Sequence, residues 1–155
     1  PWDALVARFK FQAEAGLARL LAHLMQHAPH VMPALEAADC VVPMSLSARR
    51  LRERGFNQAV LLAEALAEAA GGGARVENLL RRAQDTASQT AFDRRTRMAN
   101  LKNAFALAPR VTLNPLRRFV LIDDVFTTGS TLNHCARVLR EGGCVNVDVF
   151  TLAHG

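Results

Sequence analysis

The chain contains the stretch VLIDDVFTTGSTL at residues 120–132, in which an apolar run leads into two adjacent acids and then into a turn rich in hydroxyl groups. The apolar residues 119–122 are typical of a buried strand. Residues 130–141 have the pattern of a helix that ends at two glycines. The stretch therefore predicts a strand, a turn and a helix in immediate succession, which is the unit of α/β folds.

The turn of this unit, T-T-G-S-T at residues 127–131, has the composition of an anion-binding loop. At the start of a helix, backbone N–H groups and the helix dipole favour a phosphate, and Thr and Ser hydroxyls add further donors. Glycine permits a close approach of the backbone to the ligand. The candidate phosphate-binding residues are Thr127, Thr128, Gly129, Ser130 and Thr131.

The two acids, Asp123 and Asp124, stand at the predicted end of the strand. Carboxylates at that position can accept hydrogen bonds from the two neighbouring hydroxyls of a ribose, so that sugar and phosphate are bound together. An ordinary strand-to-helix turn with Asp as the N-cap is the alternative, and the length of the pattern argues against it. A Walker-type phosphate loop is excluded because no Lys follows the glycine.

This pattern resembles the 5-phosphoribosyl-1-diphosphate (PRPP) binding motif of type I phosphoribosyltransferases: four apolar residues, two acids, two apolar residues and T-T-G-S-T. Phe126 departs from the smaller aliphatic residue that is usual there, which concerns packing rather than chemistry. The resemblance implies an α/β fold with a mainly parallel sheet flanked by helices. It also implies that Asp123 and Asp124 are catalytic residues.

Length and composition favour a single domain over residues 1–155, since 50% of the chain is apolar. The net charge is +5, but residues 81–118 hold nine Arg or Lys against two Asp, so the positive charge is concentrated there. Three widely spaced cysteines without a C-x-x-C pair indicate neither a disulfide framework nor a zinc site and favour the cytoplasm. No apolar run reaches the roughly 18 residues of a membrane span, and charges at positions 8, 10 and 14 argue against a secretory signal.

The hydrophobic periodicity along the chain predicts alternating helices and strands joined as a mainly parallel sheet. Leucines at helical spacing predict a helix over residues 3–27, which makes up the N-terminal part of the domain, residues 1–27. The predicted strands cover residues 39–43, 75–80, 103–107, 119–122 and 144–152, and further helices cover residues 56–70 and 130–141. Residues 45–54 and 81–100 are expected to be polar loops.

Arginine is concentrated in two of the loops that follow predicted strands. Ligands in such sheets bind beyond the carboxyl ends of the strands, where the loops after Pro43, Leu80 and Asp124 are expected to meet. The planar guanidinium suits a diphosphate, which offers several oxygens. A solvated surface or a nucleic-acid patch is the alternative. The basic residues concerned are Arg49, Arg50, Arg52, Arg54, Arg81, Arg82, Arg94, Arg95, Arg97 and Lys102.

Two further segments, VPMSLSARRLRERGFNQAVLLAEALA at residues 42–67 and RRAQDTASQTAFDRRTRMANLKNAFAL at residues 81–107, resemble those of the competence protein F (ComF) family of phosphoribosyltransferase-like proteins. Gln84 departs from a position that is often basic in that family, and the N-terminal zinc ribbon of many members is absent from this chain. By this resemblance the diphosphate loop contains Arg50, Arg54, Gly55, Asn57 and Gln58, and the middle loop contains the catalytic residues Arg82 and Arg97 with Thr86, Gln89 and Asn100.

The resemblance implies transfer of ribosyl 5-phosphate from PRPP to an unknown nucleophilic acceptor, with release of diphosphate. Mg²⁺ is expected as the cofactor, held mainly by oxygens of PRPP and approached by the protein only through Asp123 and Asp124. Arg82 and Arg97 would stabilise the departing diphosphate. The middle loop is expected to close over the site and exclude water.

Two other functions remain open at this stage. One is a noncatalytic regulator that binds PRPP or a nucleotide, and the other is an accessory protein of DNA uptake whose basic loops contact single strands or the uptake machinery. Direct nucleic-acid binding is weakly supported because aromatic residues for base stacking are scarce. Metal binding by His23, His27 and His30 is disfavoured, and His134 is expected to be a plain helical residue. The acceptor, the general base and a homodimeric state are not decided by the sequence.

Overall fold

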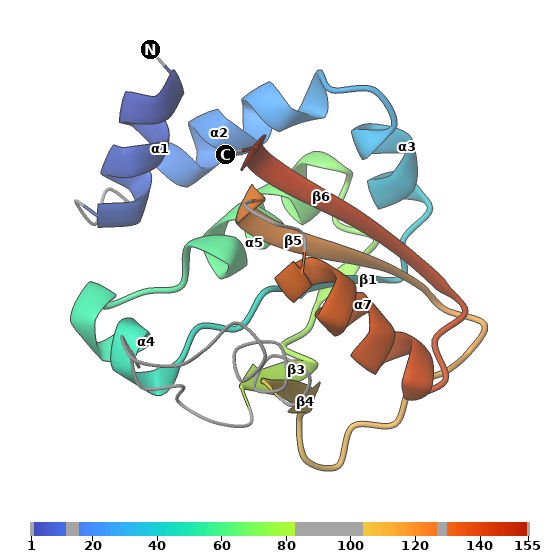
Figure 1. The fold of residues 1–155 in the computed structure, drawn as a ribbon. Coiled ribbons are helices and arrows are strands. Elements are labelled where there is room, and N and C mark those ends of the chain that lie inside the picture. Colours follow the sequence, from blue (N-terminus) through green and yellow to red (C-terminus); the bar gives the residue numbers. More distant parts are fainter. Residues whose placement is uncertain (1, 12–15, 83–103, 127–129, 155) are drawn as a thin grey trace.

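A computed structural model describes residues 2–11, 16–82, 104–126 and 130–154. Its centre is a four-stranded sheet in the order β2-β1-β5-β6, in which every neighbouring pair is parallel (Figure 1). The strands are β1 (Cys40–Pro43), β2 (Arg75–Val76), β5 (Arg118–Phe126) and β6 (Asn146–His154). The expectation of a mainly parallel α/β sheet is confirmed.

Helices cover both faces of this sheet (Figure 1). α2 (Leu17–Gln26), α3 (Val31–Glu36) and α5 (Gln58–Ala69) pack on one face, and α7 (Ser130–Glu141) packs on the other. α1 (Trp2–Phe11) lies against α2. The bounds of α7 are those predicted for the helix after the hydroxyl-rich turn.

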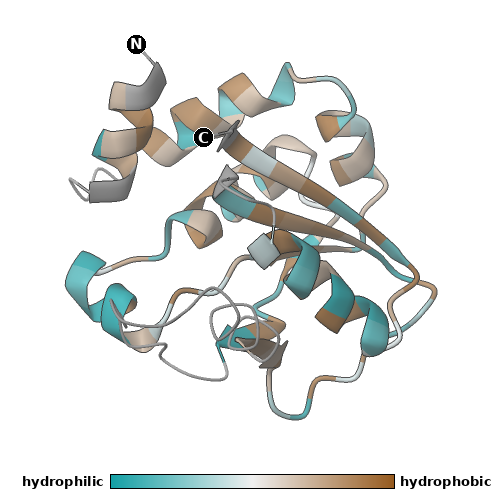
Figure 2. Ribbon diagram, in the orientation of Figure 1, coloured by the Kyte–Doolittle hydropathy of each residue, from teal (hydrophilic) through white to brown (hydrophobic). Residues whose placement is uncertain are grey.

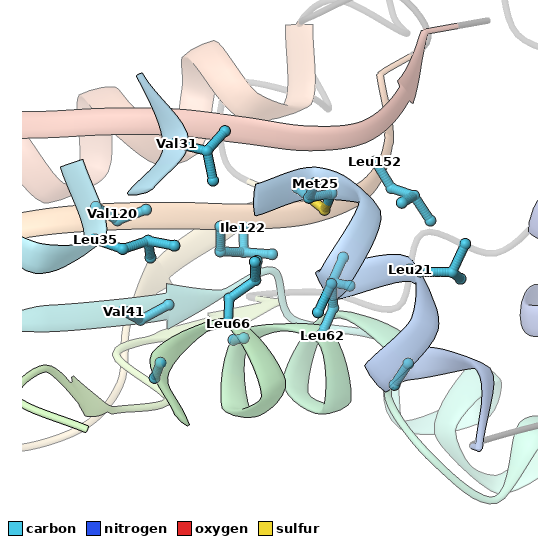
Figure 3. Packing of buried hydrophobic residues seen from close by; sticks show 14 of the residues in the cluster. Leu21, Met25, Val31, Leu35, Val41, Leu62, Leu66, Val120, Ile122 and Leu152 are labelled. Atoms are coloured by element: carbon cyan, nitrogen blue, oxygen red, sulfur yellow. The ribbon is translucent and has the colours of Figure 1, made fainter. Parts of the chain in front are cut away.

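The alternation of side chains along β5 divides the core into two clusters. Val120 and Ile122 join α2, α3 and α5 in the first cluster, whereas Phe119 and Leu121 join α7 in the second. Figure 3 shows side chains of the first cluster, including Leu66 of α5, gathered between the helices and the sheet. The central strands are apolar on both sides because each face has a helical layer to cover it. Figure 2 shows β5 as largely hydrophobic, whereas α4 (Ala48–Arg54) is mostly hydrophilic.

The expected strand over residues 75–80 is wrong in its extent. β2 ends at Val76, and the chain then turns away, with the N–H of Leu79 donating to the carbonyl of Glu77 at 3.0 Å. β3 (Leu80–Arg82) instead pairs antiparallel with β4 (Phe105–Leu107) in a separate two-stranded sheet. The apolar pattern therefore spanned two short strands separated by a turn.

Two other expectations are corrected by the structure. The loop predicted over residues 45–54 contains α4. This helix begins after Ser47, and the side chain of Ser47 accepts a hydrogen bond from the N–H of Arg50. It is followed by Gly55, which has the left-handed conformation (φ 79°). The single helix predicted over residues 3–27 is two helices, α1 and α2, with Gly16 directly before the second. Leucine spacing continues across the glycine, but glycine is a poor helix former.

Candidate active site

The acid pair lies within β5 rather than after it. Asp123 is paired in register with Thr151 of β6, and the pairing continues to Phe126, so the strand extends beyond both carboxylates. Successive strand residues point to opposite faces. Asp123 therefore shares the face of Leu121 toward α7, and Asp124 shares the opposite face with Ile122. A ribose that contacts both carboxylates must lie across the edge of the strand.

Both carboxylates are half-buried. The backbone N–H of Asp124 donates to Oδ1 of Asp123 at 2.8 Å, which orients the first carboxylate. A carboxylate that accepts from the backbone is restrained in its rotamer. The orientation of the Asp123 side chain is therefore set in part by the backbone of β5 itself.

Asp123 and Arg82 both act electrostatically on Cys135, a buried residue of α7. The pKa of this thiol is raised to about 12, mainly by burial and also by the negative charge of Asp123, while the positive charge of Arg82 acts in the opposite direction. Both charged groups are therefore within electrostatic reach of Cys135. One acid and one arginine that the resemblance assigned to the same site thus act on the same thiol.

Arg82 is held in place by the loop after β1 and by β4. Its Nε donates to the carbonyl oxygen of Ser45 at 3.3 Å, and its guanidinium carbon lies 4.8 Å from the centre of the Phe105 ring. The hydroxyl of Ser45 in turn donates to the carbonyl of Leu80. These contacts join β3 to the end of β1, although the two strands belong to different sheets. The role of Ser45 was not predicted from the sequence, in which its position after a strand is the only signal.

Asn57 and Gln58, predicted for the diphosphate loop, have positioning contacts in the structure. Oδ1 of Asn57 accepts from the N–H of Ala59 at 3.0 Å as the N-cap of α5, and its Nδ2 donates to the carbonyl of Met44 at 2.9 Å. Gln58 is buried, and its Oε1 accepts from Arg54 at 3.2 Å. These side chains fix the loop after β1 and the end of α4.

The other residues predicted for that loop lie on or after α4. Arg50 is exposed, and Arg54 is half-buried at the last position of the helix. Gly55 adopts a left-handed conformation with open space where a Cβ would be, so its requirement is one of backbone geometry.

Part of the predicted site falls outside the described residues. In the hydroxyl-rich turn these are Thr127, Thr128 and Gly129, and in the middle loop they are Thr86, Gln89, Arg97 and Asn100. Of the turn, the structure describes Ser130, which is exposed, and Thr131, which is half-buried. Both stand in the first turn of α7, where a helix favours an anion.

His134 has a larger structural role than the sequence suggested. It is buried in α7, with Nε2 at 3.4 Å from the N–H of Phe105 and Nδ1 at 2.8 Å from Nη2 of Arg137. Burial lowers its pKa, and the neighbouring Arg137 lowers it further. A neutral imidazole has one acceptor nitrogen, so only one of these donors is hydrogen-bonded at a time. His134 thereby links α7 to β4.

The described residues fit Mg²⁺ only as an ion that arrives with a polyphosphate. Among these residues, no group of three or more His, Cys, Asp or Glu side chains could hold a metal. The acids on β5 supply the hard oxygen donors that Mg²⁺ prefers, but too few to complete an octahedron.

Within the described ranges, none of the helices has the length and apolarity needed to span a membrane.

Two solved structures have a fold similar to that of this chain. The glutamine phosphoribosylpyrophosphate (PRPP) amidotransferase of B. subtilis superposes with a TM-score of 0.55 at 20% identity, over 90% of this chain and 26% of that one. A second structure, an allosteric regulatory enzyme of purine biosynthesis, gives 0.54 at 22% identity over 90% and 25% of the two chains. At these identities the comparison concerns the fold alone, and it confirms the type I phosphoribosyltransferase-like α/β architecture.

Comparison of sequences identifies relatives that match almost the whole chain, although no family model matches it. Competence protein F of Haemophilus influenzae is 36% identical over 99% of this chain and 68% of its own length. The DNA utilization protein YhgH of Salmonella typhimurium is 36% identical over 98% and 66% of the two chains. Competence protein ComFC of Streptococcus pneumoniae is 31% identical over 94% and 60%. The chain spans about two thirds of the length of these relatives or somewhat less, and it belongs to the competence protein F family.

Proposed function

We propose that this protein binds PRPP together with Mg²⁺ and transfers its ribosyl 5-phosphate to a nucleophilic acceptor, with diphosphate as the leaving group. The observation that supports this best is the position of Asp123 and Asp124 in the C-terminal half of β5, a central parallel strand that is followed in the chain by α7. In open α/β sheets phosphorylated ligands bind at the carboxyl ends of the strands. The acids would contact the sugar, and Arg82, which like Asp123 acts electrostatically on Cys135 of α7, would supply a cation for the phosphates.

The chemistry assigns a different task to each group. The bond from C1 of the ribose to the diphosphate oxygen breaks and leaves its electron pair on the diphosphate, while a new bond forms between C1 and the acceptor. Positive character on the ring is stabilised by the carboxylates of Asp123 and Asp124, and the growing charge on the diphosphate is stabilised by Arg82. Bound Mg²⁺ would offset the charge of the diphosphate. The 5-phosphate would sit at the first turn of α7, near Ser130 and Thr131.

Binding is tested by calorimetric titration of PRPP with and without Mg²⁺. The double variant Asp123→Asn with Asp124→Asn should lose affinity at least about 10-fold, because each acid that contacts a ribose hydroxyl contributes about 1.5 kcal/mol or more as a charged acceptor. Glu36→Gln with Asp148→Asn, which changes two exposed acids on α3 and β6, removes the same two charges and is the matched control. Unchanged affinity in a folded double variant would remove the proposal.

Catalysis is tested separately from binding. The protein is incubated with PRPP, Mg²⁺ and a panel of bases, amines and nucleotides, and diphosphate release is followed. Release that depends on one acceptor supports transfer and names the acceptor. Tight PRPP binding without release under any condition would indicate the noncatalytic regulator instead.

A second function, in DNA uptake, is supported by the relatives' names and by the charge of α4. Arg49, Arg50 and Arg52 are exposed on this helix, and the first of these pairs with Glu53 at 3.1 Å. We propose that both functions are cytoplasmic, because all three cysteines are free.

If α4 contacts single-stranded DNA, the logarithm of the affinity for an oligonucleotide should fall linearly with the logarithm of the salt concentration. Arg50→Glu with Arg52→Glu should reduce this slope by about 1.4. A slope that the variant leaves unchanged would exclude α4 as the contact.

A further inference from the structure

A cavity of about 720 Å³ lies between α4, the start of α5 and β3. Its apolar wall includes Leu51, Phe56 and Leu61, and its charged groups are Arg81, Arg82 and Glu64. Leu51 keeps 45% of its surface exposed although it is apolar, so the cavity opens to solvent rather than being a void of the core. Neither acid of β5 is among its lining residues. The cavity therefore shares Arg82 and Asn57 with the proposed PRPP site but not the acids that are proposed to bind the ribose.

We propose that this cavity is a second ligand site, which takes a small molecule with an aromatic ring and an anionic group. The volume falls within the roughly 300–1,000 Å³ of small-molecule sites, which are mainly apolar with a few polar groups that fix orientation. The ring would lie against Phe56 and the aliphatic side chains beside it. The anion would be bound by arginine, whose planar fork matches a carboxylate or a phosphate.

The arrangement of charges identifies the arginine concerned. Arg82 donates through Nε to Ser45, lies over the Phe105 ring and is the residue proposed to stabilise the diphosphate. Arg81 is the neighbouring residue in β3, and its side chain is exposed at the cavity. We assign the anion mainly to Arg81. The amide of Asn78, which also lines the cavity, can both donate to and accept from heteroatoms of a ring.

Because the cavity combines an apolar wall with an arginine, it should select ligands that carry both a ring and an anionic group, which a chance depression in the surface would not do. A purely apolar compound would leave Arg81 without a partner, and a small inorganic anion would leave the apolar wall in contact with water. Nucleoside monophosphates and aromatic carboxylates both combine the two features. The experiment below distinguishes these two sources.

The probe is 8-anilinonaphthalene-1-sulfonate, an aromatic anion whose fluorescence increases in an apolar site, titrated into the full chain. The wild-type protein should bind it saturably with one molecule per chain. Leu51→Glu should weaken binding at least about 10-fold, because it places a carboxylate beside the probe at a position exposed enough for the fold to accept it. Leu116→Glu is the matched control, since that leucine is 86% exposed and does not line the cavity. Arg81→Gln should weaken binding several-fold.

Displacement of the probe identifies the source of the ligand, with adenosine 5′-monophosphate in one arm and benzoate in the other. Adenosine and inorganic phosphate, which each carry one of the two features, should displace it poorly. Asp123→Asn with Asp124→Asn should bind the probe as the wild type does, so failure of the PRPP proposal would leave this result unaffected. Absence of saturable binding, or equal affinity in the Leu51 and Leu116 variants, would overturn the assignment. Methyl chemical shifts of Leu51 and Leu61 in the titrated wild type provide the same test without a variant.

Discussion

The sulfur of Cys135 lies 3.5 Å from the sulfur of Met44, and this contact joins α7 to the loop after β1. Both residues are buried. The carbonyl of Met44 is at the same time held by Asn57, and its N–H donates to the carbonyl of Ile122 at 2.8 Å. Three elements around the proposed site, namely α7, β5 and the start of α5, therefore all contact Met44. The Cys135 thiol, which stays protonated at neutral pH because burial raises its pKa, donates a weak hydrogen bond to the thioether sulfur of Met44.

The buried thiols predict a loss of stability at alkaline pH. Burial raises the pKa of Cys40 and of Cys135 to about 12, so the folded state favours the protonated form more than the unfolded state does. Their contribution to the free energy of unfolding is complete below a pH of about 9 and decreases as the pH rises toward 12. Urea unfolding at pH 8 and pH 10.5 measures it. Cys135→Ala should show a smaller decrease between the two values, and an identical decrease would contradict the assignment.

His134 predicts a loss of stability on acidification. Its pKa is lowered in the folded state, mainly by burial, so the unfolded chain takes up the proton first. The contribution to the free energy of unfolding is complete above the ordinary histidine pKa of about 6.5 and falls below it, by at most about 1.4 kcal/mol per pH unit. His134→Gln should reduce the difference between urea unfolding at pH 7.5 and at pH 5.5. An exposed histidine, His30, changed to Gln provides the control.

The two polar atoms of the Asn57 side chain make different hydrogen bonds, so we expect their contributions to the free energy of unfolding to be separable. Asn57→Ala removes both the N-cap of α5 and the bond to the Met44 carbonyl, with an expected loss of about 1–3 kcal/mol in the free energy of unfolding. Asn57→Asp keeps the oxygen that caps the helix and loses the donor, so it should be less destabilised. Denaturant titration of the two variants measures the difference. Equal losses would mean that the cap contributes nothing.

Arg117 predicts a stabilising contact at the opposite end of the sheet. Its Nη2 donates to Glu77 at 2.9 Å and to the carbonyl of Asp39 at 3.2 Å, and its guanidinium lies over the Phe119 ring. Arg117→Ala should reduce the free energy of unfolding by about 1–3 kcal/mol, since the bonds are charge-assisted and partly buried. The neighbouring Arg118→Ala, at an exposed side chain, should change it by less than about 0.5 kcal/mol. A similar effect of both variants would contradict the role given to Arg117.

The sequence allowed the parallel sheet and α7 to be predicted because local pattern and burial agree there. The apolar residues of β5 are buried on both faces, and the turn that follows leads directly into an amphipathic helix. α4 was missed because an arginine-rich segment has little apolar periodicity, and the structure describes no buried residue in it. Its cap at Ser47 was the available signal.

The candidate site was predictable only in part, since its geometry depends on contacts between distant segments. The position of Arg82 depends on Ser45, which joins β3 to the end of β1, and nothing in the local sequence indicates that contact. The placement of the two acids on opposite faces follows from the length of β5, which extends past the point where the apolar run ends. Asn57 and Gln58 were assigned to the ligand by resemblance, whereas their visible contacts support the scaffold.

The two edge strands of the four-stranded sheet differ greatly in length. β2 pairs over two residues, whereas β6 runs for nine and has a strand on only one side in the part of the chain that the structure describes. An extended strand of this length exposes many main-chain groups to an incoming strand, and Val149 adds an apolar side chain that is 38% exposed. We therefore expect any edge-to-edge association between copies of this protein at high concentration to form along β6. Placing a lysine at Val149 is the first substitution to try for improved solubility.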